Sequence, residues 1–395
     1  MKDQESIKIG CLKNKDSSPC CDSGNGAEGV RQKDATGENT CCPAVTEESA
    51  GYVIGVVATP AGMIWRVTGN WSPSDYWGQI KSRVSSFRMR YALKPGLYAI
   101  GEPGRDSDIF VSANYKLSFD ILRKSVKELN AWILVLDTNG INVWCAAGKG
   151  TFATQELVMR IAEARLDKIV DHKKLVVPQL GAAGVNARTV QKRTGFRVYF
   201  GPVAAGDIPA YLKAGYTKTE EMRKVRFTII DRLVLTPMEI NPAMVKYPLF
   251  ALIILLIFGL QPSGIFFRDA WEGGLSFLTL GLITVFSGAF LTPVLLPYIP
   301  FRSFAIKGWI MGMLSVLISL PFLEPARNIF LLIAGYLFFP LASSYIALQF
   351  TGSTTFTGMS GVKKELRIAI PFYLTGAAIS LVLLAGYKLV QWEVI

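Results

Sequence analysis

Histidine is almost absent from this chain, whose 395 residues include only one, His172. That residue stands in the charged stretch DHKK (171–174), a setting typical of a solvated surface side chain. A Cys/His catalytic pair would therefore depend on this one exposed position. The scarcity of histidine disfavours enzymes that use such a pair.

Cysteine is also scarce outside the N-terminal tail, because Cys145 alone lies beyond the first 42 residues. No cysteine spacing typical of a zinc finger or an iron–sulfur cluster is present, and no ligands cluster near Cys145. The adjacent AGKGT (147–151) is not a phosphate-binding loop. Val143 stands where that loop has glycine, and Gly150 stands where it has serine or threonine.

Charged residues are missing from the middle of five long apolar runs in the second half of the chain. At about 20 residues per crossing, each run is long enough to span a membrane. They cover 247–267, 273–297, 303–323, 328–350 and 368–390. Because pumps and ion pathways need ionisable groups at membrane depth, we expect an anchor or docking module rather than a transporter. GWIMG (308–312) fits a face of small residues on which two helices pack.

The net charge of +12 fits a membrane protein with basic loops better than a nucleic-acid-binding protein. One set of loops carries most of the positive charge, at Lys246, Arg302, Lys307, Lys363, Lys364 and Arg367. The opposite set carries Arg268 and Arg327, and Lys388 flanks the last run. The N-terminus has no apolar core of secretory length. We therefore predict a multi-pass protein of the cytoplasmic (inner) membrane, with its N-terminal domain in the cytosol.

Three regions follow from composition: a polar tail (1–50), a mixed domain (51–246) and the apolar helices (247–395). Strand-like and helix-like stretches alternate in the mixed domain, which predicts an α/β, Rossmann-like sandwich followed by an all-α transmembrane domain of five helices. We expect a buried strand at 131–137 and a long helix at about 144–166. We also expect a further strand at VRFTII (225–230).

Glycine- and alanine-rich loops follow several expected strands, as in TNGINV (138–143), PQLGAAG (178–184) and GPVAAGD (201–207). Such loops let the backbone approach a large, flat ligand closely, and strand ends are the usual ligand site of α/β sheets. Cys145 falls in the first turn of the helix after TNGINV. A helix N-terminus favours a thiolate, which is a soft metal ligand or a nucleophile. Position alone favours the alternative, a small residue that packs the helix on the sheet.

Three stretches resemble one known family: NVWCAAGK (142–149), GLYAIGEPG (96–104) and SANYKLSFDILR (112–123). They resemble the corrinoid proteins of microbial mercury methylation, and the first resembles the cap-helix motif of that family. The resemblance covers about 51–246, and five C-terminal spans match the family architecture. The same domain is similar to the corrinoid-binding domain of the corrinoid iron–sulfur protein of acetyl-CoA metabolism.

The resemblance implies a cobalamin-type corrinoid bound base-off, with the Cys145 thiolate as lower axial ligand to cobalt. The chain lacks the Asp-x-His-x-x-Gly run of His-ligated cobalamin proteins. The residues that would lie under the corrinoid ring are Asn142, Val143, Trp144, Ala146, Ala147, Gly148 and Lys149. Loops near Ser112, Ser118 and Ala205 would hold the ring edge and the nucleotide tail.

The implied activity is a corrinoid-dependent methyltransferase that produces methylmercury. A methylfolate-linked donor supplies the methyl group to cobalt, and Hg(II) accepts it with carbanion or radical character. Electron donation by the thiolate should favour that transfer. Because the chain has no cysteine spacing for an iron–sulfur cluster, a separate ferredoxin-like protein is implied as electron donor.

Vicinal cysteine pairs stand in the tail, at Cys20-Cys21 and Cys41-Cys42. Adjacent thiols suit Hg(II), so these pairs are predicted to capture it; a redox sensor and a tail without function are the alternatives. Two further functions stay open for the whole chain. One is a membrane corrinoid methyl carrier of one-carbon metabolism. The other is a non-enzymatic binder or sensor of soft metals.

Overall fold

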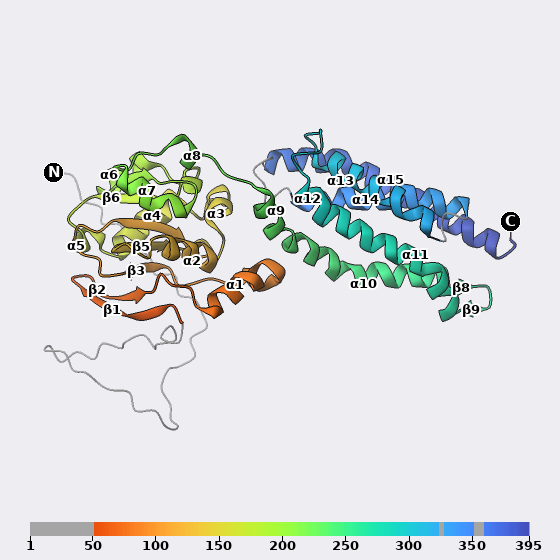
Figure 1. The fold of residues 1–395 in the computed structure, drawn as a ribbon, viewed down its shortest axis with the longest axis horizontal. Coiled ribbons are helices and arrows are strands. Elements are labelled where there is room, and N and C mark those ends of the chain that lie inside the picture. Colours follow the sequence, from red (N-terminus) through yellow and green to blue (C-terminus); the bar gives the residue numbers. More distant parts are fainter. Residues whose placement is uncertain (1–50, 324–327, 351–358, 395) are drawn as a thin grey trace, which may run out of the picture. The chain divides into compact units, whose positions relative to one another are not determined.

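The structure is a computed structural model that describes residues 51–323, 328–350 and 359–394 (Figure 1). Its first part contains a seven-stranded sheet of order β1-β2-β3-β5-β4-β6-β7. The strands are β1 Val53–Thr59, β2 Gly62–Val67, β3 Gly96–Ile100, β4 Ile109–Ala113, β5 Ala131–Leu136, β6 Lys174–Val177 and β7 Arg197–Phe200.

The sheet is mixed rather than wholly parallel. Strands β5, β4, β6 and β7 run parallel to one another, whereas β3 pairs antiparallel with β5 and β1 pairs antiparallel with β2. All six residues of β5, AWILVL, are buried, as expected for a central strand covered on both faces. The expected α/β class is confirmed, and the carboxyl ends of the four parallel strands share one edge.

Helices cover both faces of this sheet. Alternate residues of β4 and β5 enter two separate cores, so that Val111 and Leu134 lie in one and Phe110 and Ile133 lie in the other. The first core is completed by α3 Val143–Lys149, α4 Thr154–Glu163 and α6 Ala187–Thr194, and the second by α2 Lys116–Ser125 and α7 Ile208–Lys213. The remaining helices of this part are α1 Pro73–Val84, α5 Leu166–Ile169 and α8 Glu220–Arg223.

Two expected elements are wrong. The long helix at about 144–166 is divided into α3, α4 and α5. Gly150 adopts a left-handed conformation (φ 80°) that ends α3 after seven residues, and Arg165 (φ 48°) separates α4 from α5. The strand expected at VRFTII does not form, since 225–228 are irregular and helix α9 Ile229–Leu235 begins at the last two residues of that stretch. Thr228 and Asp231 form a reciprocal capping box there, which starts a helix at the point where the apolar residues suggested a strand.

Within its described residues, the second part has five helices long and apolar enough to cross a membrane. They are built on α10 Pro237–Gly259, α11 Phe267–Phe286, α13 Phe304–Ser319, α14 Ile329–Gln349 and α15 Met359–Gln391, with α12 Thr292–Val294 after α11. The first helix ends at Gly259, where a short hairpin of β8 Leu260–Gln261 and β9 Gly264–Ile265 turns the chain into α11. The expected first run, 247–267, crosses that hairpin.

Small residues let α13 and α14 pack closely, as GWIMG predicted. A Cβ added at Gly308 would lie 2.4 Å from the Cβ of Ala347, and one added at Gly312 would lie 2.5 Å from that of Ser343. The Ser343 hydroxyl donates to the carbonyl oxygen of Gly308 at 2.9 Å. The small-residue face is therefore confirmed as a helix–helix contact.

Candidate functional site

A cavity of about 330 Å³ lies at the carboxyl ends of the parallel strands. Its wall combines the end of β4, the loops after β6 and β7, one face of α2 and the start of α3. Every side chain that lines it is uncharged: Phe110, Val111, Ser112, Ser118, Ile121, Leu122, Asn142, Val143, Trp144, Val176, Pro178, Leu180, Gly201, Pro202, Val203, Ala205 and Ile208. This edge is where open α/β sheets bind ligands.

The cavity brings together six of the expected site residues from three separate segments. They are Ser112, Ser118, Asn142, Val143, Trp144 and Ala205. The rest of the expected cap helix, Cys145 to Lys149, lies beside the cavity rather than in its wall. Two large apolar side chains of the wall, Ile121 and Trp144, are 39% and 40% exposed. Exposed apolar groups around a cavity are typical of a ligand site.

Helix α3 presents Cys145 on its outer side. The Asn142 side chain caps the helix, because its Oδ1 accepts a hydrogen bond from the Cys145 backbone N–H at 2.9 Å. Ala146 and Ala147 are buried against the sheet, whereas Cys145 is half-buried. Gly148 lies one turn further on, and a Cβ added to it would meet nothing within 4 Å. The thiol therefore stands beside a flat, uncrowded patch of helix backbone.

Close backbone contact fixes the buried side of α3. A Cβ added at Gly184 would lie 2.0 Å from the carbonyl oxygen of Phe152 and 3.2 Å from the Cα of Ala147. Only glycine fits at this position, since the obstructing atoms belong to backbone. The loop after β6 thereby holds α3 against the sheet and sets the direction in which Cys145 faces.

Asn114 organises the loop that leads into α3, and the sequence analysis missed it. Its side-chain Oδ1 accepts hydrogen bonds from the Thr138 backbone N–H at 3.0 Å, from the Thr138 hydroxyl at 2.8 Å and from the Gly140 N–H at 2.9 Å. Its Nδ2 donates to Asp137 at 3.1 Å. Asn139 and Gly140 both have positive φ, so this anchoring maintains a sharp turn directly before the Asn142 cap.

Comparison with known proteins relates this site to one family. Residues 87–212 match the family model described as the CO dehydrogenase/acetyl-CoA synthase delta subunit. That segment contains every residue lining the cavity, together with α3. The match covers less than half of the chain and does not reach the membrane-type helices.

Curated relatives are gamma subunits of the acetyl-CoA decarbonylase/synthase complex. The subunit from Archaeoglobus fulgidus is 30% identical over 135 residues, which are 34% of this chain and 28% of the relative. The subunit from Methanopyrus kandleri is 30% identical over 132 residues, 33% of this chain and 28% of the relative. The chain thus matches a little over a quarter of the length of these relatives, and its domain is homologous to that part of them.

A buried ionic network supports α2, which forms one wall of the cavity and lies within the matched residues 87–212. Arg123, fully buried on α2, pairs at 2.8 Å with Asp120 and at 2.8 Å with Asp75 of α1. Lys116 also pairs with both carboxylates, at 2.5 and 3.2 Å. Burial raises the pKa of Asp75, but the Ser72 backbone hydrogen bond and the Arg123 and Lys116 contacts outweigh it and lower that pKa to about 2. The network thus joins α1 to the helix that carries Ser118.

Other candidate chemistry lies outside the cavity. The ring of His172 is half-buried and bound to backbone on both sides, with Nε2 2.8 Å from the Ser107 carbonyl oxygen and Nδ1 accepting the Lys174 N–H. Within the described residues, no group of three or more His, Cys, Asp or Glu side chains could hold a metal ion. Cys20, Cys21, Cys41 and Cys42 lie outside the described residues.

Proposed function

We propose that this chain is a membrane-anchored corrinoid methyltransferase that delivers a methyl group to Hg(II). One observation supports the corrinoid most directly. Six of the residues that the family resemblance assigns to the cofactor line one cavity at the ligand-binding edge of the sheet, although they come from β4, α2, the start of α3 and the loop after β7, and Cys145 lies beside that cavity. The homology of this segment to subunits of a complex that makes and cleaves acetyl-CoA supports the same class of chemistry.

The residues present fit a large, flat and soft-metal-containing group. The cavity wall is uncharged, the α3 surface beside it is flat at Gly148, and a half-buried thiol stands on that surface. A thiolate is a soft donor suited to a transition metal, and the chain provides no competing cluster of metal ligands among its described residues. When bound, the corrinoid would supply a cobalt ion able to carry a methyl group.

The protein residues would act mainly by positioning. Cys145 would hold the metal through its thiolate sulfur, and Lys149, exposed one turn further along α3, would add positive charge near that thiolate. The Asn142 cap and the Asn114 hydrogen bonds would hold the thiol in place. Ser112 and Ser118 would contact the ring edge or its polar substituents from the opposite wall, with Ala205 leaving space beside them.

The remaining components of the proposed reaction come from outside the described residues. A methylfolate-linked protein would supply the methyl group, and a ferredoxin-like iron–sulfur protein would supply electrons. The tail cysteine pairs would capture Hg(II) and pass it to the site. The domain would face the cytosol, since the basic loops favour that orientation of the five helices.

Methylmercury formation by the full-length chain tests this function. We expect Cys145→Ala to abolish product while the protein still inserts in membranes, because the soft donor is lost without a change in the apolar helices. Serine at positions 20, 21, 41 and 42 should lower the rate only at limiting Hg(II). Full activity of the Cys145→Ala chain would contradict the ligand role, and unchanged rates of the tail variant would contradict Hg(II) capture.

A second candidate is a methyl carrier of one-carbon metabolism, and the comparisons favour it specifically. The homologous relatives are named as subunits of the acetyl-CoA decarbonylase/synthase complex, without reference to mercury. The two functions share the cofactor and differ in the acceptor. A corrinoid-loaded chain that transfers methyl to an acetyl-CoA-forming partner, but never to Hg(II), would establish the second function. A chain that binds no corrinoid would instead favour a soft-metal sensor.

A further inference from the structure

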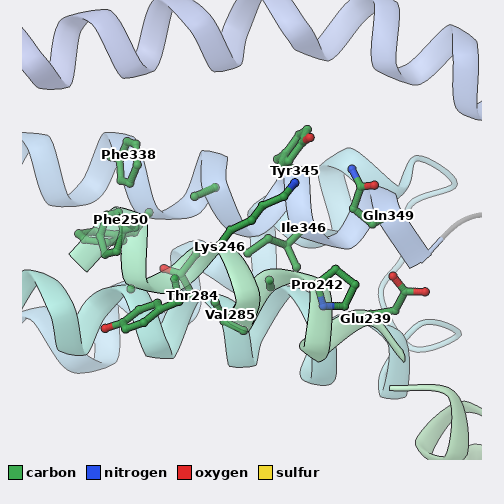
Figure 2. Close-up of a pocket in the computed structure, with 15 residues that line it drawn as sticks. Glu239, Pro242, Lys246, Phe250, Thr284, Val285, Phe338, Tyr345, Ile346 and Gln349 are labelled. Atoms are coloured by element: carbon green, nitrogen blue, oxygen red, sulfur yellow. The ribbon is translucent and has the colours of Figure 1, made fainter. Parts of the chain in front are cut away.

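A second cavity, of about 480 Å³, lies among α10, α11 and α14 of the membrane-type helices (Figure 2). One part of its wall is aromatic and apolar, with Phe250, Phe338 and Phe339. Another part is polar, with Glu239, Lys246 and Gln349. Gly281 makes room for the aromatic part, because a Cβ there would lie 2.5 Å from the Phe250 ring. The cavity therefore has an apolar part and a polar part.

Thr284 on α11 gives an independent indication of a ligand. Its side chain lines the cavity and is 3% exposed, and within the described residues its hydroxyl has no hydrogen-bond partner. Two neighbouring hydroxyls do have partners. The Thr279 hydroxyl donates to the Leu275 carbonyl oxygen at 2.9 Å, and the Ser287 hydroxyl donates to the backbone carbonyl oxygen of Thr284 at 3.1 Å. A buried hydroxyl without a partner is unfavourable, so an acceptor group of a bound molecule would stabilise it.

Lys246 supplies positive charge to the same cavity. It makes no ion pair within the described part of the chain, and in Figure 2 its side chain extends toward the α14 wall that carries Tyr345 and Gln349. Lys246 lies within the candidate span Ile229–Gly259, directly before the most apolar stretch of α10. Phe250 lies one turn deeper. A positive group followed one turn later by an aromatic wall matches a molecule with an anionic head and an apolar tail.

We propose that this cavity binds one anionic phospholipid. Its phosphate would lie at Lys246, with Tyr345 and Gln349 as further polar contacts, and an acyl chain would follow Phe250 and Phe338. A carbonyl or phosphate oxygen of the lipid would accept the Thr284 hydrogen bond. The mostly apolar wall excludes free phosphate as a sufficient ligand. Lys246 favours an anionic over a zwitterionic head, because the Glu239 carboxylate in the same polar part stands seven residues earlier on α10, about two helical turns away. The site is independent of the corrinoid in the α/β domain.

Lipid binding to the purified, delipidated full-length chain tests the site. Phosphatidylglycerol and phosphatidylcholine with identical acyl chains are titrated, and bound lipid is counted by native mass spectrometry. We expect one phosphatidylglycerol to bind well above the phosphatidylcholine level. Lys246→Gln should weaken that binding about fivefold, the order expected for the attraction between one lysine and an anionic lipid. Lys364→Gln, an equal charge change at an exposed position of α15, is the matched control.

Thr284→Val separates a ligand contact from a packing role. The substitution removes the hydroxyl at nearly constant volume, so we expect a higher melting temperature without lipid and a smaller lipid-induced rise in melting temperature. Thr279→Val removes a hydroxyl already bonded within α11 and should leave the lipid-induced rise unchanged. Equal binding of both lipids, or wild-type binding by both cavity variants, would overturn the proposal. Inorganic phosphate giving the same stabilisation as the lipid would also overturn it.

Discussion

Asn114→Ala is predicted to loosen the loop that presents Cys145, without unfolding the sheet. Asn114 is 6% exposed and Thr138 is fully buried, so the substitution leaves the backbone N–H groups of Thr138 and Gly140 without their acceptor. An unsatisfied buried donor costs about 1–3 kcal/mol. Water entering beside Gly140 offsets part of this cost. We therefore expect about 2–4 kcal/mol of local destabilisation.

Hydrogen exchange measured by mass spectrometry on the full-length chain provides the assay. A local cost of about 2–4 kcal/mol corresponds to roughly 30- to 1,000-fold faster exchange, if these amides exchange through local opening. The increase should be confined to the loop and α3. Asn130→Ala is the matched control, because Asn130 makes one exposed hydrogen bond, to the Glu102 N–H at 2.9 Å. Unchanged exchange in α3 would refute the positioning role of Asn114.

Three further predictions concern stability. Arg123→Ala should lower the free energy of unfolding by about 3–5 kcal/mol, since it leaves two buried carboxylates with Lys116 as their one remaining cationic partner among the described residues; denaturant titration would show this, and a loss below about 1 kcal/mol would contradict it. Because the pKa of Asp75 is lowered from 3.8 to about 2, its ionised form contributes about 2 kcal/mol above pH 4 and loses this as pH falls toward 2. The difference in free energy of unfolding between wild type and Asp75→Asn should therefore become smaller as pH falls over that range. A difference that stays constant with pH would contradict the contribution of ionised Asp75 to stability. Gly308→Ala should destabilise the α13–α14 contact by about 1–3 kcal/mol in a detergent melt, whereas Gly335→Ala, with its nearest contacts at 3.4 Å, should be tolerated.

Local patterns in the sequence predicted the parts of the fold that depend on local chemistry. The apolar run 131–137 became β5 because a strand buried on both faces needs apolar residues throughout. Asn186 caps α6 by accepting from the Thr189 N–H, as is typical of asparagine before the first turn of a helix. GWIMG predicted a close helix contact of α13, because any helix that packs closely against another needs small residues at the contact.

Other features could not be predicted because they depend on residues distant in sequence. Asn114 anchors a loop 24 and 26 residues further along the chain, and nothing in its local sequence indicates those partners. The break after Lys149 depends on Gly150 adopting a left-handed conformation, although glycine is also tolerated inside helices. Ile121 follows the buried Leu117 by four residues, the spacing of one helix face, yet it is 39% exposed at the cavity. Periodicity alone cannot distinguish a core residue from a wall of a ligand site.

The most direct test of the central claim is an absorption spectrum of the full-length chain loaded with cobalamin, recorded beside the Cys145→Ala variant. The account predicts a base-off spectrum with a thiolate-dependent band in the wild type. It predicts loss of that band in the variant, since no other cysteine lies in the described α/β domain. Identical spectra of the two proteins would contradict cobalt ligation by Cys145. Failure of both proteins to bind cobalamin would contradict the corrinoid site itself.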